Sequence, residues 1–211
     1  TNALIKVFVG SSGVTKSIKG TSGKDTITAG TKADIIDLSK GGADIVKIAA
    51  GHSTWSSTSN NVDKIASFST SGLTASADKL VFSVGTVTKA TAASSVEAAT
   101  AVKGETVAAG TVLANIDANG LLTASGINAN KIDTLEEYLN LAKIAIDSGT
   151  ATAGETLAFK FAGNTYVYDV ATVTAGAVTT FDVVELTGVT SAIGVNDTSV
   201  TPLIADTILI G

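Results

Sequence analysis

The chain has 211 residues, of which 14 are basic and 19 are acidic, giving a net charge of −5 and a pI near 4.8. It contains neither cysteine nor methionine, so thiol redox chemistry and thiolate metal sites are excluded. The acidic balance argues against nucleic acid and anionic membranes as partners. No apolar stretch reaches the roughly 18 residues that a membrane-spanning helix needs. Nothing at the N-terminus has the pattern of a signal peptide, and because the chain begins without Met we expect a fragment or a processed product.

The first residues predict a strand over 3–9, which alternates apolar and polar side chains, and a turn over 10–13. The stretch from 20 to 51 then carries a repeat. Its acidic residues recur in steps of nine and ten residues, and a β-branched apolar residue stands two positions after each of them. These positions are Asp25, Asp34 and Asp44, followed by Ile27, Ile36 and Val46.

This spacing loosely matches the nonapeptide pattern G-G-x-G-x-D-x-U-x of calcium-binding parallel β-rolls, in which U is a large apolar residue. Each unit would be a glycine-rich turn followed by a short strand, and two units would make one coil. Asp25 and Asp44 would therefore stack on one side and Asp34 on the other. Turn glycines would let backbone carbonyls close on Ca²⁺, to which the aspartates supply charge.

The copies are imperfect. Thr21 and Lys32 stand where the pattern has glycine, and lysines adjoin each turn. Aspartate and glycine are also ordinary turn residues, so a metal-free stack is the alternative interpretation. The chain then continues with a polar loop over 52–61 and two strands within 62–84, each introduced by an Asp-Lys pair. The predicted metal-site residues are Asp25, Asp34, Asp44, Gly20, Gly23 and Gly42, with Asp63 and Asp78 as further ligands or plain turn acceptors.

Residues 86–110 show too little pattern to assign. A hairpin is predicted over 112–123, because Asn119-Gly120 is a strong two-residue turn signal. A helix is predicted near 134–148, where Thr134 and Glu137 have capping-box spacing and Gly149 follows the last turn. Glu136 and Glu137 are interpreted as solvated charge at its start.

Two alternating strands are expected within 156–170 and a third over 179–186, with a short apolar strand over 205–211. These segments hold most of the aromatic residues, which predicts a second hydrophobic core. The expected fold is mainly β: a short degenerate parallel β-roll with closing strands over 1–84, then a β-rich domain with one helix over 85–211. An antiparallel sandwich is the alternative.

Together, the degenerate repeat at 20–47, the DKIASF and DKLVFS segments after it, and the helix followed by FAGNTYVYDV and DVVELTGV resemble type I secreted RTX proteins. The resemblance is to the C-terminal region of bacterial surface-layer (S-layer) proteins and related adhesins. It implies an extracellular structural protein of the cell surface that assembles with itself. It also implies export by a type I ABC secretion machinery, which reads the C-terminal region, and folding by external Ca²⁺. Full RTX rolls have many repeats that match the nonapeptide pattern closely, whereas this chain has about three degenerate ones.

We do not expect an enzyme, because the chain has a single histidine, His52, and none of the sequence motifs of hydrolases. It could nevertheless be the C-terminal module of a secreted RTX adhesin or hydrolase. Trp55, in the polar loop, is a candidate for stacking on a cell-surface glycan or, alternatively, a residue that covers the edge of the core.

Overall fold

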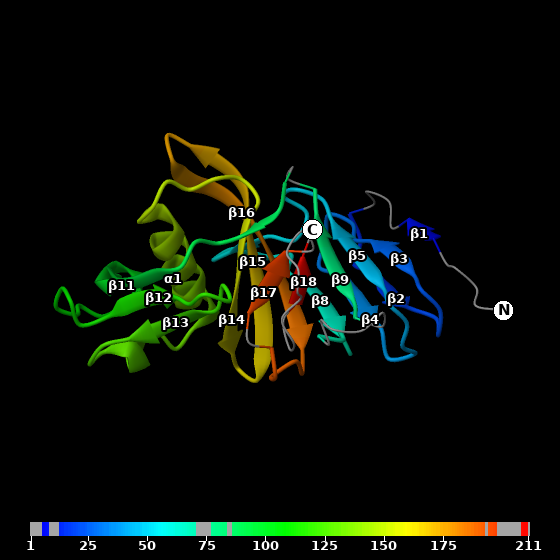
Figure 1. Ribbon diagram of the computed structural model, residues 1–211, viewed down its shortest axis with the longest axis horizontal. Coiled ribbons are helices and arrows are strands. Elements are labelled where there is room, and N and C mark those ends of the chain that lie inside the picture. The colour runs from blue at the N-terminus through cyan, green and yellow to red at the C-terminus, as the bar shows by residue number, and fades with distance from the viewer. Residues whose placement is uncertain are drawn as a thin grey trace.

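The structure is a computed structural model that describes residues 6–8, 13–70, 77–83, 86–192, 194–197 and 208–210. It is mainly β, with mixed and parallel sheets, one α-helix and two 3₁₀ turns (Figure 1). The remaining residues include parts of several predicted features: 3–5 and 9 of the first strand, 10–12 of the first turn, 71–76 and 84 of the segment with two strands, 84–85 at the domain boundary, and 205–207 and 211 of the last strand.

One sheet has six strands, and every neighbouring pair in it is parallel. Four of its strands come from the first 82 residues, and the two C-terminal strands of the chain extend the sheet beyond them. The sheet therefore contains segments from both ends of the chain. In sheet order the strands are β1 (Lys6–Phe8), β3 (Thr26–Thr28), β5 (Ile45–Ile48), β9 (Lys79–Phe82), β18 (Ile208–Ile210) and β17 (Val195–Asp197).

The second sheet has seven strands and is mixed. Its three longest strands form an antiparallel meander, and the last of these pairs in parallel with a strand from the N-terminal part. In sheet order the strands are β10 (Thr88–Lys89), β14 (Glu155–Phe161), β15 (Asn164–Thr174), β16 (Ala177–Thr187), β8 (Asp63–Ala66), β4 (Ile35–Asp37) and β2 (Ser17–Lys19).

Between residues 17 and 82 the chain visits these two sheets alternately, apart from a short hairpin between β5 and β8. The apolar residues of the repeat stand in register as a result. In the seven-stranded sheet Ile18 pairs with Ile36, which pairs with Ile65. In the six-stranded sheet Ile27, Val46 and Leu80 align in the same way, and all six side chains are buried in one core cluster. The nine- and ten-residue spacing therefore correctly predicts which residues face inward.

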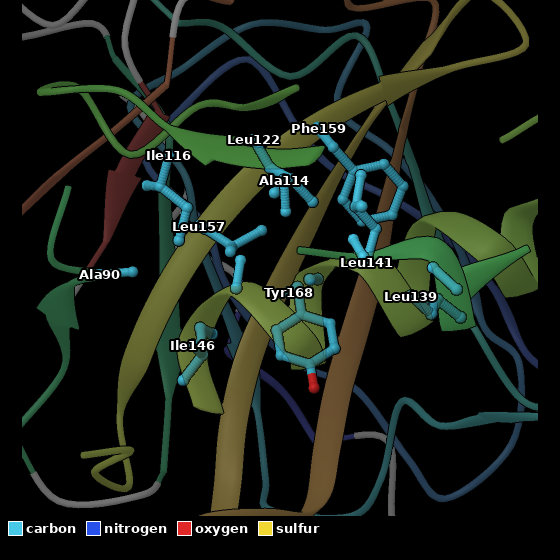
Figure 2. Close-up of a cluster of buried hydrophobic side chains, with 14 of the residues drawn as sticks. Ala90, Ala114, Ile116, Leu122, Leu139, Leu141, Ile146, Leu157, Phe159 and Tyr168 are labelled. Atoms are coloured by element: carbon cyan, nitrogen blue, oxygen red, sulfur yellow. The ribbon is translucent and has the colours of Figure 1, made fainter. Parts of the chain in front are cut away.

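A second core lies on the opposite face of the β14–β16 meander. It is closed by α1 (Leu135–Asp147) and by a three-stranded antiparallel sheet, and Figure 2 shows its side chains meeting from these elements. Tyr138 stacks on Phe159, which stacks on Tyr166, with ring centroids 5.3 Å apart in both pairs. The predicted aromatic core is confirmed. The strands of the small sheet are β11 (Ala93–Glu97), β12 (Leu113–Ile116) and β13 (Leu122–Ser125).

The helix confirms its prediction, and both hydrogen bonds of the capping box between Thr134 and Glu137 are present. The interpretation of Glu137 as solvated charge was wrong, because its side chain is only 3% exposed. It accepts hydrogen bonds from the backbone N–H groups of Lys103, Asp133 and Thr134. Although burial disfavours the charged carboxylate, these donors lower its pKa.

The meander is buried on both faces and therefore serves both cores. Ala158, Val167 and Val184 contribute to the core beside the repeat, whereas Leu157 and Tyr168 contribute to the other. Strands from both sides of the predicted boundary near residue 84 pair within each large sheet. The division into two domains stays a prediction.

Short elements form where the sequence predicted a loop or gave no prediction. A two-stranded hairpin, β6 (Trp55–Ser56) with β7 (Ser59–Asn60), lies within the predicted polar loop. The unassigned stretch 86–110 contributes β10, β11 and η1 (Ala99–Ala101), and η2 (Ala129–Lys131) precedes the helix. Among the described residues no helix is long and apolar enough to cross a membrane.

Candidate functional site

The aspartates of the repeat form two hydrogen-bonded series, which we call the first and second ladders. Each aspartate immediately precedes or begins a short strand, so parallel pairing of those strands brings equivalent aspartates together. All five side chains are at most 2% exposed. The first ladder contains Asp25, Asp44 and Asp78, and the second contains Asp34 and Asp63.

In the first ladder the backbone N–H of Asp25 donates to Oδ1 of Asp44 over 2.9 Å. The N–H of Asp44 donates in turn to Oδ1 of Asp78 over 2.8 Å, and Oδ2 of Asp78 accepts from the N–H of Ser69. Asp25, at the end of the series, accepts from the N–H of Thr21. Asp44 and Asp78 thus each satisfy the backbone N–H of the preceding aspartate in the series, which would otherwise be buried without an acceptor.

The second ladder follows the same rule. Asp34 accepts from the N–H groups of Lys16 and Gly30, both over 2.7 Å, and its own N–H donates to Oδ1 of Asp63 over 2.8 Å. The N–H of Asp63 donates to the hydroxyl of Ser53. The spacing of the repeat correctly predicts that Asp25 lies beside Asp44 and that Asp34 belongs to the other series.

The first member of this series was not predicted from the sequence. Lys16-Ser17-Ile18 stands nine residues before Asp25-Thr26-Ile27 and occupies the same structural position, with lysine in place of aspartate. The nine-residue period was the available signal. The lysine donates its backbone N–H to Asp34 but carries no carboxylate to accept from a further backbone N–H, so the second ladder ends here.

Burial changes the titration of the ladder carboxylates. It raises the pKa of Asp63 to about 8 and that of Asp78 to about 6, and it also raises the pKa of Asp44. The Oδ2 atoms of Asp44 and Asp63 are buried and have no hydrogen-bond partner. A buried carboxylate oxygen without a donor favours either a proton or a cation beside it.

The predicted glycines fit closely around these carboxylates. A Cβ on Gly42 would lie 2.4 Å from the carbonyl oxygen of Gly23 and 2.7 Å from Oδ1 of Asp44. A Cβ on Gly20 would lie 3.1 Å from Oδ2 of Asp25. Glycine is therefore needed at residue 42 for the turn to close against the carbonyl of Gly23 and the carboxylate of Asp44.

The donor set fits Ca²⁺ only in part. Oxygen ligands suit this ion, but it takes six to eight of them. Among the described residues no three Asp, Glu, His or Cys side chains converge on one point. Both carboxylate oxygens of Asp34, and both of Asp78, already accept backbone hydrogen bonds. Asp44 and Asp63 keep an unpartnered oxygen, so they are the better candidates, with backbone carbonyls supplying further ligands.

A further group of buried acids adjoins the second ladder and was not predicted. Asp169 and Asp182 are cross-strand partners on β15 and β16, and both side chains are fully buried. Asp182 accepts from the N–H groups of Gly51 and Ser53, while Oδ1 of Asp169 accepts from the hydroxyl of Thr156. Oδ2 of Asp169 has no partner, and burial raises the pKa of this residue to about 8.

Two residues of the predicted polar loop, Ser53 and the candidate Trp55, are packed against the rest of the fold. The hydroxyl of Ser53 is buried and donates to the carbonyl of Val183 over 2.5 Å, so it links the loop to the meander. Trp55 is partly buried and packs against the core that contains α1. This position agrees with a residue that covers the edge of the core.

No protein-family model, curated protein or solved structure matches this chain.

Proposed function

We propose that this chain is a structural module of a secreted bacterial surface-layer protein with RTX-like repeats. In this proposal residues 17–82 are a short degenerate β-roll, and the stacked turns take up Ca²⁺ outside the cell. The protein would be exported by a type I ABC machinery and would assemble with itself at the cell surface. The alternative is the C-terminal module of a secreted RTX adhesin or hydrolase.

The aspartate ladders are the observation that supports this proposal most strongly. Repeated Asp-x-apolar units occupy equivalent positions on parallel strands, with their apolar residues in register and their aspartates linked in series. A repeat of this kind buries a continuous core only when its units stack. The chain therefore uses its repeat as a scaffold, which suits a structural protein.

Calcium would act at the unpartnered carboxylate oxygens. Asp44 and Asp63 are the residues that would hold it, with backbone carbonyls as further ligands. The ion would supply positive charge to carboxylates that burial otherwise pushes toward protonation. Because the ladders exist only when the strands are stacked, an ion bound there would favour the folded state over the unfolded chain.

The packing of Trp55 and Ser53 gives no support to glycan binding or hydrolysis as the activity of this chain. An array of cell-surface glycans tests the adhesin alternative. Binding that is lost in Trp55→Ala would favour an adhesin module over a lattice module.

Assembly is tested by electron microscopy of the purified chain, and of a longer protein that contains it, in millimolar Ca²⁺ and in EGTA. We expect ordered sheets or oligomers from the longer protein in Ca²⁺ and their loss in EGTA. Strictly monomeric behaviour of the longer protein in Ca²⁺ would contradict the lattice role.

A further inference from the structure

The charges of this acidic protein are segregated along the chain. Residues 13–50 hold six of its 14 basic residues and four of its 19 acidic ones, which leaves eight basic and 15 acidic residues elsewhere. The N-terminal part is therefore positive by two charges, and the rest is negative by seven. Such segregation creates opposite potentials on different parts of one surface.

At the surface the positive excess of residues 13–50 is larger than this count. Three of the four aspartates, Asp25, Asp34 and Asp44, are buried in the ladders. The fourth, Asp37, forms an ion pair of 2.7 Å with Lys19. Four exposed lysines form no ion pair with any described residue, and we call them the lysine end: Lys24, Lys32, Lys40 and Lys47.

The opposite end of the molecule is acidic. Residues 93–137 contain six acidic residues and two lysines. Both lysines are already paired, Lys103 with Glu136 and Lys131 with Glu105. Two exposed acidic residues at this end form no ion pair with any described lysine, and together with Glu105 and Glu136 they make up the acidic end: Glu97 and Asp133.

The two ends lie far apart. Figure 1 shows β2, β3, β4 and β5 at one end of the longest axis, and β11, β12, β13 and α1 at the other. The sheet edge at the lysine end also has basic residues, because Lys16 precedes the edge strand β2 and Lys19 ends it. Lysines on an edge strand oppose the addition of another strand. A contact at this end would therefore be made by side-chain charge.

We propose that copies of this chain associate head to tail, with the lysine end of one copy against the acidic end of the next. This inference rests on the proposed role as a lattice protein and assigns the partner of one of its surfaces. Because the two complementary patches lie on opposite ends, the contact is heterologous and continues from copy to copy instead of closing a two-fold dimer. A second copy is favoured over an anionic polymer because the chain itself carries the complementary charge.

Two charge-reversal variants test this contact. The lysine-end variant is Lys24→Glu/Lys32→Glu/Lys40→Glu, and the acidic-end variant is Glu105→Lys/Asp133→Lys/Glu136→Lys. All six side chains lie at the surface, and none of them supplies a ladder bond. Circular dichroism and thermal melts establish that both variants fold. Sedimentation velocity in EGTA, across a range of protein and NaCl concentrations, then measures association without any contribution from Ca²⁺.

The unmodified chain should associate at about 20 mM salt and dissociate at about 500 mM, where the Debye length falls well below 10 Å. Each variant alone should be monomeric, since its two ends carry the same sign. An equimolar mixture of the two variants should associate again, because one then presents two acidic ends and the other two basic ends. If the variants were monomeric only because they had lost their structure, mixing them would not restore association.

Three results would overturn the inference. The unmodified chain could stay monomeric at low salt, the variants could associate as strongly as the unmodified chain, or the mixture could fail to associate. If the unmodified chain is monomeric but binds polyglutamate through the lysine end, the partner is an anionic polymer instead of a second copy. None of these results bears on Ca²⁺-dependent assembly, which the microscopy measures separately.

Discussion

The backbone N–H of Asp25 donates a hydrogen bond of 2.9 Å to the carboxylate of Asp44, a residue 19 positions later in the chain. The same relation links Asp44 with Asp78 and Asp34 with Asp63. In each pair the carboxylate of the later aspartate thus accepts from the backbone N–H of the earlier one, at the start of a short parallel strand. These side chains have a structural role whether or not an ion lies beside them.

The Asp25–Asp44 relation predicts different outcomes for two substitutions of Asp44. Asp44→Ala leaves the buried N–H of Asp25 without an acceptor, which should cost about 1–3 kcal/mol of unfolding free energy. Asp44→Asn keeps an oxygen for that bond and removes a buried charge, so it should cost less than Asp44→Ala. Urea denaturation in EGTA measures both. Equal losses in the two variants would show that this hydrogen bond contributes little.

Gly42 should tolerate no side chain. In Gly42→Ala the new Cβ would meet the carbonyl oxygen of Gly23 at 2.4 Å, on a backbone with φ of +140°. The matched control is Gly41→Ala, where φ is +74° and no atom lies within 4 Å, so only the left-handed backbone costs about 1–2 kcal/mol. We expect Gly42→Ala to lower the thermal midpoint clearly more than Gly41→Ala. A midpoint at or above that of the control would contradict the tight turn.

The helix start provides a second matched pair. Glu137→Ala removes the acceptor of three backbone N–H groups and of the Thr134 hydroxyl, so it should destabilise the fold by at least the 0.5–2 kcal/mol typical of a lost cap. Glu136→Ala removes a partly exposed ion pair with Lys103, which is worth about 0–1 kcal/mol. Chemical denaturation compares them. Similar losses of unfolding free energy in the two variants would mean that the buried hydrogen bonds of Glu137 contribute no more than the surface ion pair of Glu136.

The buried pair Asp169 and Asp182 should make stability depend on pH. The pKa of Asp169 is about 8 in the folded protein against an ordinary value of 3.8, so the folded state holds more protons than the unfolded state between these limits. Its contribution therefore weakens the fold as pH rises from about 4 to about 8, by up to roughly 1.4 kcal/mol per pH unit.

Asp169→Asn tests this dependence, because the amide imitates the protonated acid. Unfolding free energies measured in EGTA at pH 5, 6, 7 and 8 should fall less steeply for the variant than for the unmodified chain. We expect the variant to be the more stable of the two at pH 8. Parallel pH profiles would show that Asp169 does not retain its proton.

Local patterns in the sequence predict local structure well. The helix follows from its capping box and apolar face, and the hairpin at 162–163 joins two alternating strands. The repeat predicts both the inward residues and the grouping of its aspartates, because parallel stacking converts a regular period into spatial neighbours.

The remaining structure depends on pairing between distant residues. β8 pairs with β16, some 120 residues later, and this pairing brings Ser53 and Asp63 close to Asp182. No local pattern indicates a buried acid group assembled from three separate segments. The burial of Glu137 was not predicted for the same reason, since one of its hydrogen-bond donors is the backbone N–H of the distant residue Lys103.

Calcium uptake at the aspartate ladders is the central claim, and thermal unfolding in Ca²⁺ and in EGTA tests it most directly. At a hundredfold excess over its dissociation constant, an ion bound only to the folded state contributes about 2.7 kcal/mol, or roughly 5–10 °C in the midpoint. We predict this rise for the unmodified chain and for Glu105→Gln, an exposed control, and its loss in Asp44→Asn/Asp63→Asn. An unchanged midpoint in the unmodified chain, or the full rise in the double variant, would contradict the claim.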